Sequence, residues 1–302
     1  MQSFHVMSTT SGNKDHSNLQ AGLRDMNVEP IHRIATGRDV RIAIVDTGID
    51  DHRGPRRSGD SSENFVPTSP NTADDIHGTA VAGVIAAAAD NGQGIVGVAP
   101  GAKLIGLKAC WQSGPGTADA VCNSFTLALA LNTAITLKPD ILNLSLVGPP
   151  DPLLKRLLER ALADGMIVVA SAPSDGPSKD AFPASVNGVI AVRSAASGTP
   201  AGKALAAPGN EILTTLPHGT YNFMSGSSFA AAHVSGLIAL LLELDPKLTA
   251  PQISALLKNP GNATAVAGID ACGIVTTMRP GAGCAQIAER SSAHAAHARA
   301  PL

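Results

Sequence analysis

The 302-residue chain lacks an excess of charge of either sign and lacks a basic cluster. Its 22 lysine and arginine residues face 24 aspartate and glutamate residues, which gives a formal net charge of −2. Proteins that bind nucleic acid or anionic membranes depend on clustered positive charge. We therefore expect neither nucleic acid nor an anionic membrane among its partners.

A long uninterrupted apolar run is also missing. No run approaches the roughly 18 residues that cross a bilayer, so we expect no membrane span. Residues 1–18, MQSFHVMSTTSGNKDHSN, are polar and contain no apolar core of a signal peptide. If the protein is exported, we expect its signal to be absent from this chain.

Cysteine is scarce, and its spacing argues against a zinc site. The four cysteines lie at 110, 122, 272 and 284, and no Cys-x-x-Cys pair occurs. Four cysteines allow three disulfide connectivities, and buried free thiols are the alternative. We suspect the two near pairs, Cys110–Cys122 and Cys272–Cys284. The even number and tight spacing favour a secreted or periplasmic protein and leave a cytoplasmic location open.

The chain does contain ample material for a core. Hydrophobic residues make up 44% of it, and 30 glycines and 21 prolines indicate a compact protein rich in loops. This length fits one large domain. We predict a polar, loosely ordered N-terminal segment over 1–24, one domain over 25–290, and a low-complexity Ala/His tail over 291–302.

Short apolar runs alternate with helical patterns along the domain. Strands alternating with helices at this spacing form βαβ units. We therefore predict a three-layer α/β/α domain with a mainly parallel central sheet. The predicted strands are 41–46, 103–109, 141–145, 166–172 and 188–194, and the predicted helices include 77–89, 119–138 and 151–165.

Polar residues follow these strands at one edge of the predicted sheet. Asp46 ends the first strand, Ser145 ends the third, and residues 171–175 follow the fourth. His77 opens the helix after an acidic loop. Because ligands bind at the carboxyl ends of strands in such sheets, we expect the functional site there.

A serine-rich turn precedes the main apolar helix, MSGSSFAAAHVSGLIALLLE (224–243). A serine in the first turn of a helix lies near unpaired N–H groups and the positive end of the helix dipole. A simple N-cap is the alternative interpretation. A serine nucleophile needs a base, and that base needs an acid to fix its tautomer. Asp46, His77 and Ser228 supply these groups in chain order, and the absence of Gly-x-Ser-x-Gly around Ser228 disfavours the α/β-hydrolase elbow.

Four segments of the chain resemble the motifs of one family. IVDTGID (44–50), HGTAVAGVIA (77–86), GVAPGAKL (97–104) and SGSSFAAAHVSG (225–236) are similar to the Asp, His, structural and Ser motifs of subtilisin-like serine peptidases, in the family's order. The resemblance extends from about Leu23 to about Ala288. It implies a subtilisin-like fold and hydrolysis of peptide bonds in extended polypeptides through an acyl-enzyme.

Carried onto this chain, the resemblance implies a role for each residue of the triad. Asp46 orients the imidazole, His77 acts as general base and then acid, and Ser228 attacks the scissile carbonyl. The backbone N–H of Ser228 would stabilise the oxyanion. The family's second donor is an asparagine, and here Ser174 stands at its position. Because a serine hydroxyl reaches less far, a weakened or inactive peptide-binding scaffold is the alternative function, with a transpeptidase as a third hypothesis.

The resemblance also implies where substrate binds. An extended peptide would pair with residues 143–148 as an added strand, opposite a wall around 114–116. An apolar pocket formed by 170–175 and 181–185 would accept Leu, Met, Phe or Ala, and Phe182–Pro183 is expected to be cis. The predicted substrate-binding residues are Ser145, Leu146, Val147, Gly148, Ser171, Asp175 and Phe182.

Two further implications concern metal and partners. Members of the family often bind structural calcium, although the chemistry requires no cofactor. Asp90 and Asn91 lie where one such site is common, but a solvated turn is equally compatible because the carboxylates have no regular spacing. The expected partners are a polypeptide substrate and an inhibitory pro-domain, which has no counterpart in this sequence.

Overall fold

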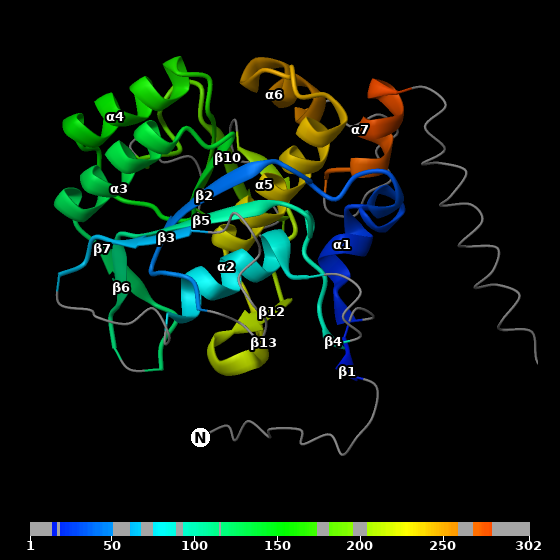
Figure 1. Cartoon of the computed structure of the whole chain (residues 1–302), viewed down its shortest axis with the longest axis horizontal. Coiled ribbons are helices and arrows are strands. Elements are labelled where there is room, and N and C mark those ends of the chain that lie inside the picture. The colour runs from blue at the N-terminus through cyan, green and yellow to red at the C-terminus, as the bar shows by residue number, and fades with distance from the viewer. Residues whose placement is uncertain are drawn as a thin grey trace, which may run out of the picture.

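The computed structural model describes residues 14–16, 19–50, 61–67, 75–88, 93–114, 116–173, 181–195, 204–258 and 268–279. A seven-stranded sheet crosses the molecule, with helices on both of its faces (Figure 1). Every strand pair in this sheet is parallel. This arrangement confirms the predicted three-layer α/β/α fold with a parallel central sheet.

The order of strands in the sheet is β11-β10-β9-β8-β2-β5-β3. All five predicted strands are present, and the two edge strands, β3 and β11, are additional. Strand β3 has the polar sequence SSEN, and the apolar β11 is only three residues long, so neither shows the longer apolar run that predicts a buried strand. The strands are β2 (Arg41–Asp46), β3 (Ser61–Asn64), β5 (Lys103–Lys108), β8 (Ile141–Leu144), β9 (Ile167–Ser171), β10 (Ile190–Ser194) and β11 (Leu205–Ala207).

Two apolar clusters lie on opposite faces of the sheet. Alternate residues of β2 contribute to each, with Ile42 and Ile44 on one face and Ala43 and Val45 on the other. The first face is covered by α2 (Ile76–Ala86), α5 (Ser227–Leu244), α6 (Ala250–Lys258) and α7 (Ala271–Met278). The second is covered by α3 (Ser124–Leu137) and α4 (Pro152–Ala163).

The predicted helix over 119–138 begins later than expected, at Ser124. Residues 120–122 form a strand instead, β7 (Ala120–Cys122), which pairs with β6 (Cys110–Gln112) as a hairpin. Asn123 then caps α3, because its side chain accepts a hydrogen bond from the backbone N–H of Thr126. The helix therefore starts where the hairpin ends.

The smaller elements complete the domain. A second hairpin pairs β12 (Ile212–Leu216) with β13 (Thr220–Met224), and β12 packs against α2. The remaining elements are β1 (Lys14–Asp15), α1 (Ala21–Asp25), β4 (Gln93–Gly94) and the 3₁₀ turns η2 (Glu29–Arg33) and η4 (Pro217–Gly219).

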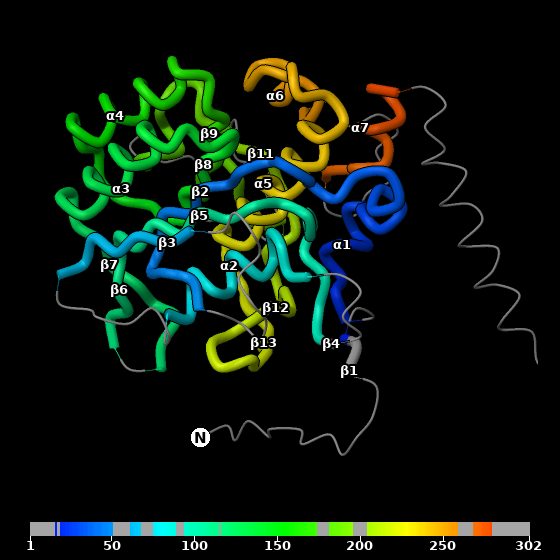
Figure 2. Tube along the Cα trace, in the orientation of Figure 1, coloured from blue at the N-terminus to red at the C-terminus, as the bar shows by residue number. Residues whose placement is uncertain are grey.

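Two segments near the ends of the described chain, one following α1 and the other forming α7, lie side by side next to the core. In Figure 2 the segment around α1 lies next to α7, and Ala271 N–H donates to Met26 O at 2.9 Å. Gln20 and Leu23 are buried. The packed part of the chain therefore includes residues that the sequence had assigned to the loosely ordered N-terminal segment.

Helix α5 is longer than the apolar runs on which the expectation of no membrane span was based. It is 18 residues long with a mean hydropathy of 1.6, so among the described helices it alone has the length and composition of a membrane span. However, 83% of that stretch is buried inside the domain. A helix that is apolar on all sides is also typical of a protein core, and α5 packs against α2, β8, β9 and β10.

Candidate active site

Strand β2 and helix α2 bring an aspartate and a histidine together. Asp46 ends β2 and is buried, and His77 is the second residue of α2. The Nδ1 of His77 lies 2.8 Å from Oδ1 and 2.9 Å from Oδ2 of Asp46. The carboxylate also accepts a hydrogen bond from the Thr47 backbone N–H at 2.7 Å. An imidazole held through Nδ1–H leaves Nε2 as the acceptor.

The charge state of His77 follows from two opposing effects. Burial lowers the pKa of His77, whereas the negative charge of Asp46 and its hydrogen bond raise it by more. The resulting pKa lies above the ordinary value of 6.5. The Phe229 ring lies beside the imidazole, with a centroid distance of 5.9 Å and the two ring planes tilted by 48°.

Helix α5 supplies the serine. Ser228 lies in its first turn, after Gly226, whose φ of +151° lies in a region that favours glycine. The Ser228 hydroxyl donates to the backbone oxygen of Ser145 at 3.1 Å, and the Ser145 hydroxyl donates to the backbone oxygen of Ser228 at 3.1 Å. This reciprocal pair joins the start of α5 to the end of β8.

Two buried side chains extend this connection into the core. Asn143 donates through Nδ2 to the Ser145 hydroxyl at 3.0 Å, and its Oδ1 accepts a hydrogen bond from Ser235 at 2.9 Å. Asn143 and Ser235 are fully buried, and each finds its partner inside the protein. The network therefore fixes the segment after β8 against α5.

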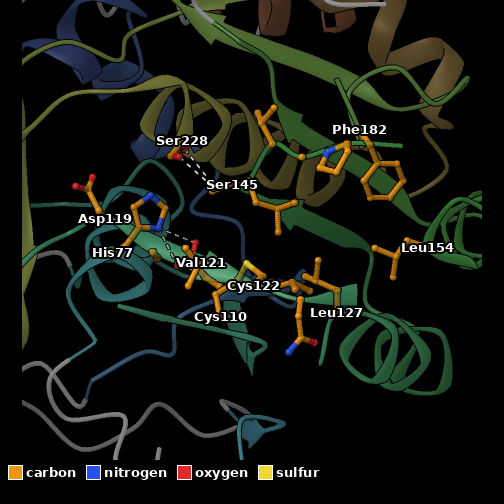
Figure 3. A pocket seen from close by; sticks show the side chains of 18 of the residues that line it. His77, Cys110, Asp119, Val121, Cys122, Leu127, Ser145, Leu154, Phe182 and Ser228 are labelled. Carbon is orange, nitrogen blue, oxygen red and sulfur yellow. Dashed lines mark hydrogen bonds and ion pairs between the residues drawn. A yellow bond between two sulfur atoms is a disulfide. The ribbon is translucent and has the colours of Figure 1, made fainter. Parts of the chain in front are cut away.

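Asp46, His77 and Ser228 line one groove of about 760 Å³ (Figure 3). Residues 145–148 form one wall, and residues 118–122, which are β7 and the residues before it, form the other. The Cys110–Cys122 disulfide lies in this wall, as Figure 3 shows, and confirms that suspected pairing. The wall predicted around 114–116 includes residue 115, which lies outside the described residues. The Phe182–Pro183 bond is cis, as predicted.

Six of the seven predicted substrate-binding residues lie in the described part of the chain, and they fall into two groups. Ser145, Leu146, Val147, Gly148 and Phe182 line the groove. Ser171 is buried, and its hydroxyl donates to the backbone oxygen of Leu146 at 3.1 Å. The Gly148 N–H and C=O are both bonded to the backbone of Phe182, at 2.9 and 3.1 Å, so the edge of this wall that is free to pair ends at Val147.

Several predicted residues lie outside the described part of the chain. These are Ser174, Asp175, Asp90, Asn91 and Cys284, the last of which belongs to the suspected Cys272–Cys284 pair. Within the described residues, no group of three or more His, Cys, Asp or Glu side chains is arranged to hold a metal ion.

Sequence reasoning missed the residues that hold the site together. Lys108 is buried beside the pair, Asn143 and Ser235 form the polar network, and Gln112 accepts a hydrogen bond from the N–H of Ile76 at 2.9 Å. The available signal was polarity within an apolar strand: Asn143 interrupts strand β8, ILNL, whereas Lys108 stands at the end of β5.

The fold and the groove define the class of protein. It is an α/β protein with a parallel sheet, in which an aspartate, a histidine and a serine from three different elements line one groove at the carboxyl edge of the sheet. The family model described as the subtilase family matches residues 37–272. The chain belongs to the subtilase family.

Individual relatives agree with this assignment. Subtilisin E of Bacillus subtilis (strain 168) is 36% identical over 239 residues, which cover 74% of this chain and 61% of that protein. The match therefore spans less than two thirds of Subtilisin E. Subtilisin Savinase of Lederbergia lenta is 34% identical over 254 residues, which cover 81% of this chain and 91% of that protein.

Solved structures show the same similarity. Fervidolysin from Fervidobacterium pennivorans, a keratinolytic enzyme related to subtilisin, matches with a TM-score of 0.67 and 26% identity over 88% of this chain and 47% of that one. A cold adapted subtilisin-like serine proteinase matches with a TM-score of 0.62 and 25% identity over 78% of this chain and 88% of that one.

Proposed function

We propose that the chain is a serine endopeptidase that hydrolyses extended polypeptides through an acyl-enzyme. The observation that carries the proposal is the Asp46–His77 hydrogen bond in the groove that Ser228 also lines. Membership of the subtilase family supports it. Ser228 is the nucleophile, His77 the general base and then acid, and Asp46 the group that fixes the imidazole.

The first step requires a movement of the Ser228 hydroxyl. It donates to the Ser145 backbone oxygen, and it must turn from there toward Nε2 of His77 to lose its proton. Such hydrogen bonds are often long or misaligned before substrate binds. The oxygen then attacks the scissile carbonyl carbon, and the proton on Nε2 passes to the leaving amine as the peptide C–N bond breaks.

The negative charge that develops on the carbonyl oxygen needs donors. The backbone N–H of Ser228 lies in the first turn of α5, where N–H groups have no partner within the helix and the dipole is positive. We assign this group to the oxyanion hole, with the Ser174 hydroxyl as its second donor.

An extended substrate would lie along residues 145–147 as an added strand. The Ser145 and Val147 backbone groups are the proposed partners, and Val147 is 48% exposed. Phe182 and Leu146 line the groove with apolar surface, which favours Leu, Met, Phe or Ala before the cut. Ser171 and Asp175 complete the proposed pocket.

The proposal extends to the location of the protein, a bound metal and a partner. The Cys110–Cys122 disulfide favours an oxidising compartment, so we place the protein outside the cytoplasm, secreted or periplasmic. The proposed chemistry uses side chains and backbone groups alone, with structural calcium at Asp90 and Asn91 as an additional feature and an inhibitory pro-domain as a partner.

The direct test is labelling with a fluorophosphonate followed by peptide mapping. Ser228→Ala should abolish labelling. Ser227→Ala is the matched control, because the Ser227 hydroxyl accepts a hydrogen bond from the Ser194 N–H at 3.3 Å and does not line the groove. Labelling at Ser228 in both the original protein and this control supports the peptidase. A folded protein that takes up no label contradicts it and favours the peptide-binding scaffold.

A further inference from the structure

A lysine side chain lies buried beside Asp46. Lys108 is the last residue of β5, and the parallel register places it opposite Asp46 of β2. Its side chain is 0% exposed. Because paired residues of neighbouring strands project from the same face of a sheet, both side chains lie on the face that α2 covers. A buried ammonium is costly unless it is paired and hydrogen-bonded.

Three acceptors surround the ammonium of Lys108. Its Nζ donates to both carboxylate oxygens of Asp75, at 2.6 Å each, and to the backbone oxygen of Thr47. An ammonium has three N–H donors, so each of them has a partner. Thr47 follows Asp46, and Asp75 precedes His77 by two residues. Lys108 therefore joins the two segments that carry the Asp46–His77 pair.

Asp75 is used differently from an ordinary helix cap. It is the N-cap residue of α2, but its side chain makes no capping hydrogen bond to the helix. Aspartate is a favoured N-cap because its carboxylate accepts hydrogen bonds from the first turn. Here the carboxylate, 7% exposed, is bonded to Lys108. The start of α2 is thus tied to β5.

Thr47 forms a second connection between the same segments. Its hydroxyl oxygen accepts a hydrogen bond from the Gly78 N–H at 3.0 Å. Gly78 lies so close to the turn after β2 that a Cβ there would be 2.1 Å from the backbone oxygen of Gly48. The turn after Asp46 and the first turn of α2 are therefore in direct contact, and Lys108 bonds to both sides.

Stability alone does not account for such a pair. Replacing a buried ion pair with apolar residues of similar volume is often neutral or stabilising. A displacement of catalytic groups by about 1 Å, in contrast, can cost about 10²-fold in rate. We infer that Lys108 is a positioning residue: with Asp75 and Thr47 it fixes the distance between Asp46 and His77. This inference rests on the function proposed for those two residues.

The decisive variant replaces the pair with apolar residues, Lys108→Met/Asp75→Leu. It leaves no buried charge behind, so we expect the protein to fold with a similar thermal midpoint. We expect kcat to fall by about tenfold or more and KM to stay within about twofold. Lys103→Met is the matched control. Lys103 lies at the exposed start of the same strand, and its Nζ forms an ion pair with Oδ1 of Asp39 at 2.8 Å. Removing this pair should leave kcat unchanged.

A second measurement does not depend on turnover. Imidazole ¹H–¹⁵N NMR should detect the Nδ1 proton shared by His77 and Asp46 at low field in the original protein and in Lys103→Met. We expect this resonance to shift upfield or disappear in the double variant. A folded double variant with an unchanged resonance and kcat within about twofold would overturn the inference.

The two proposals can fail separately. If the original protein hydrolyses nothing but the resonance is lost in the double variant, the proposed function is wrong and the positioning role stands. If the double variant does not fold, Lys108→Met/Asp75→Asn gives the same comparison, because it also leaves no buried charge and the amide keeps the shape of the carboxylate. Unchanged kcat and resonance in that variant would likewise contradict the inference.

Discussion

The contact between His77 and Asp46 sets the pH range in which His77 can accept a proton. Burial lowers the pKa of His77, and the charge and hydrogen bond of Asp46 more than offset that effect. The proposed reaction needs neutral His77, because only the neutral imidazole accepts a proton. The protonated, inactive form therefore persists above pH 6.5, the ordinary pKa of histidine.

We expect kcat/KM to fall about tenfold per pH unit on the acid side of the raised His77 pKa. Asp46→Asn removes both effects that raise this pKa and leaves burial, which lowers it. This variant should lose about 10⁴-fold in kcat, and the acid limb of its residual activity should move to lower pH. A pH–rate profile of both proteins measures the shift. An acid limb at the same pH in both would show that Asp46 does not control His77.

The buried side chain of His233 leads to a prediction about the pH dependence of stability. Its side chain is completely buried in α5, and burial lowers its pKa to about 4, against smaller opposing effects of backbone hydrogen bonds to Phe229 and Pro208. The unfolded chain binds a proton near pH 6.5, whereas the folded protein does not until about pH 4. The contribution of neutral His233 to the free energy of unfolding is therefore fully present above pH 6.5, and it is lost as the pH falls to about 4.

We expect this one group to account for roughly 3 kcal/mol of the free energy of unfolding lost over that range. His233→Gln cannot take up the proton, so its unfolding free energy should depend less on pH between 6.5 and 4 by a comparable amount. Urea unfolding of both proteins across this range measures the difference. Parallel curves for the two proteins would exclude His233 as the group responsible.

At the scale of secondary-structure elements, the sequence predicted the helices and strands that have a strong local pattern. The apolar strands and the capped helix α4, with Asp151 before Pro152, follow from residues adjacent in the chain. Strand β3 could not be predicted, because its polar residues become extended only by pairing with β5. The late start of α3 depends on Cys122 bonding to Cys110, and sequence alone left three connectivities open.

At the site, too, the sequence predicted residues in local motifs and missed a contact between residues far apart in the chain. Asp46, His77 and Ser228 were predicted because each lies in a recognisable local motif. Lys108 was missed because its partner Asp75 lies 33 residues away and only the fold brings them together. Nothing in the strand KLIGLK distinguishes a buried lysine from an exposed one at its end.

The β6–β7 hairpin yields a prediction about the groove. The Cys110–Cys122 bridge closes a loop with a sequence separation of 12. The double variant Cys110→Ala/Cys122→Ala should lower the free energy of unfolding by about 3 kcal/mol, because the unfolded chain gains freedom. Since this hairpin lines the groove without supplying the proposed catalytic groups, KM should rise more than kcat falls.

Thermal unfolding and steady-state kinetics measure these two effects. Val121→Ala is the control on the same hairpin, because it trims a 45% exposed groove residue and keeps the bridge. It should raise KM and leave the thermal midpoint within about 1 °C. A double cysteine variant with an unchanged midpoint would show that the bridge does not stabilise the folded state.

At the scale of the whole molecule, α5 connects the site to the core. Its first turn carries Ser228, and the rest of the helix packs against α2 and the central strands. The single tryptophan, Trp111, lies in strand β6 and pairs with Val121 of β7, the strand that lines the groove. If the domain unfolds as one cooperative unit around α5, a destabilising substitution in the buried part of α5 should also lower the unfolding midpoint measured at Trp111.

Leu237→Ala tests that cooperativity. Leu237 is fully buried in α5, so truncation should lower the free energy of unfolding by about 2–5 kcal/mol. Trp111 fluorescence and far-UV circular dichroism should report the same lowered midpoint, because the hairpin and helices unfold together. Leu153→Ala, at a 55% exposed position of α4, should change stability by no more than about 0.5 kcal/mol. If the dichroism midpoint fell while the Trp111 transition stayed in place, the hairpin would be a separate unit, and α5 would not hold the two walls of the groove in one folding transition.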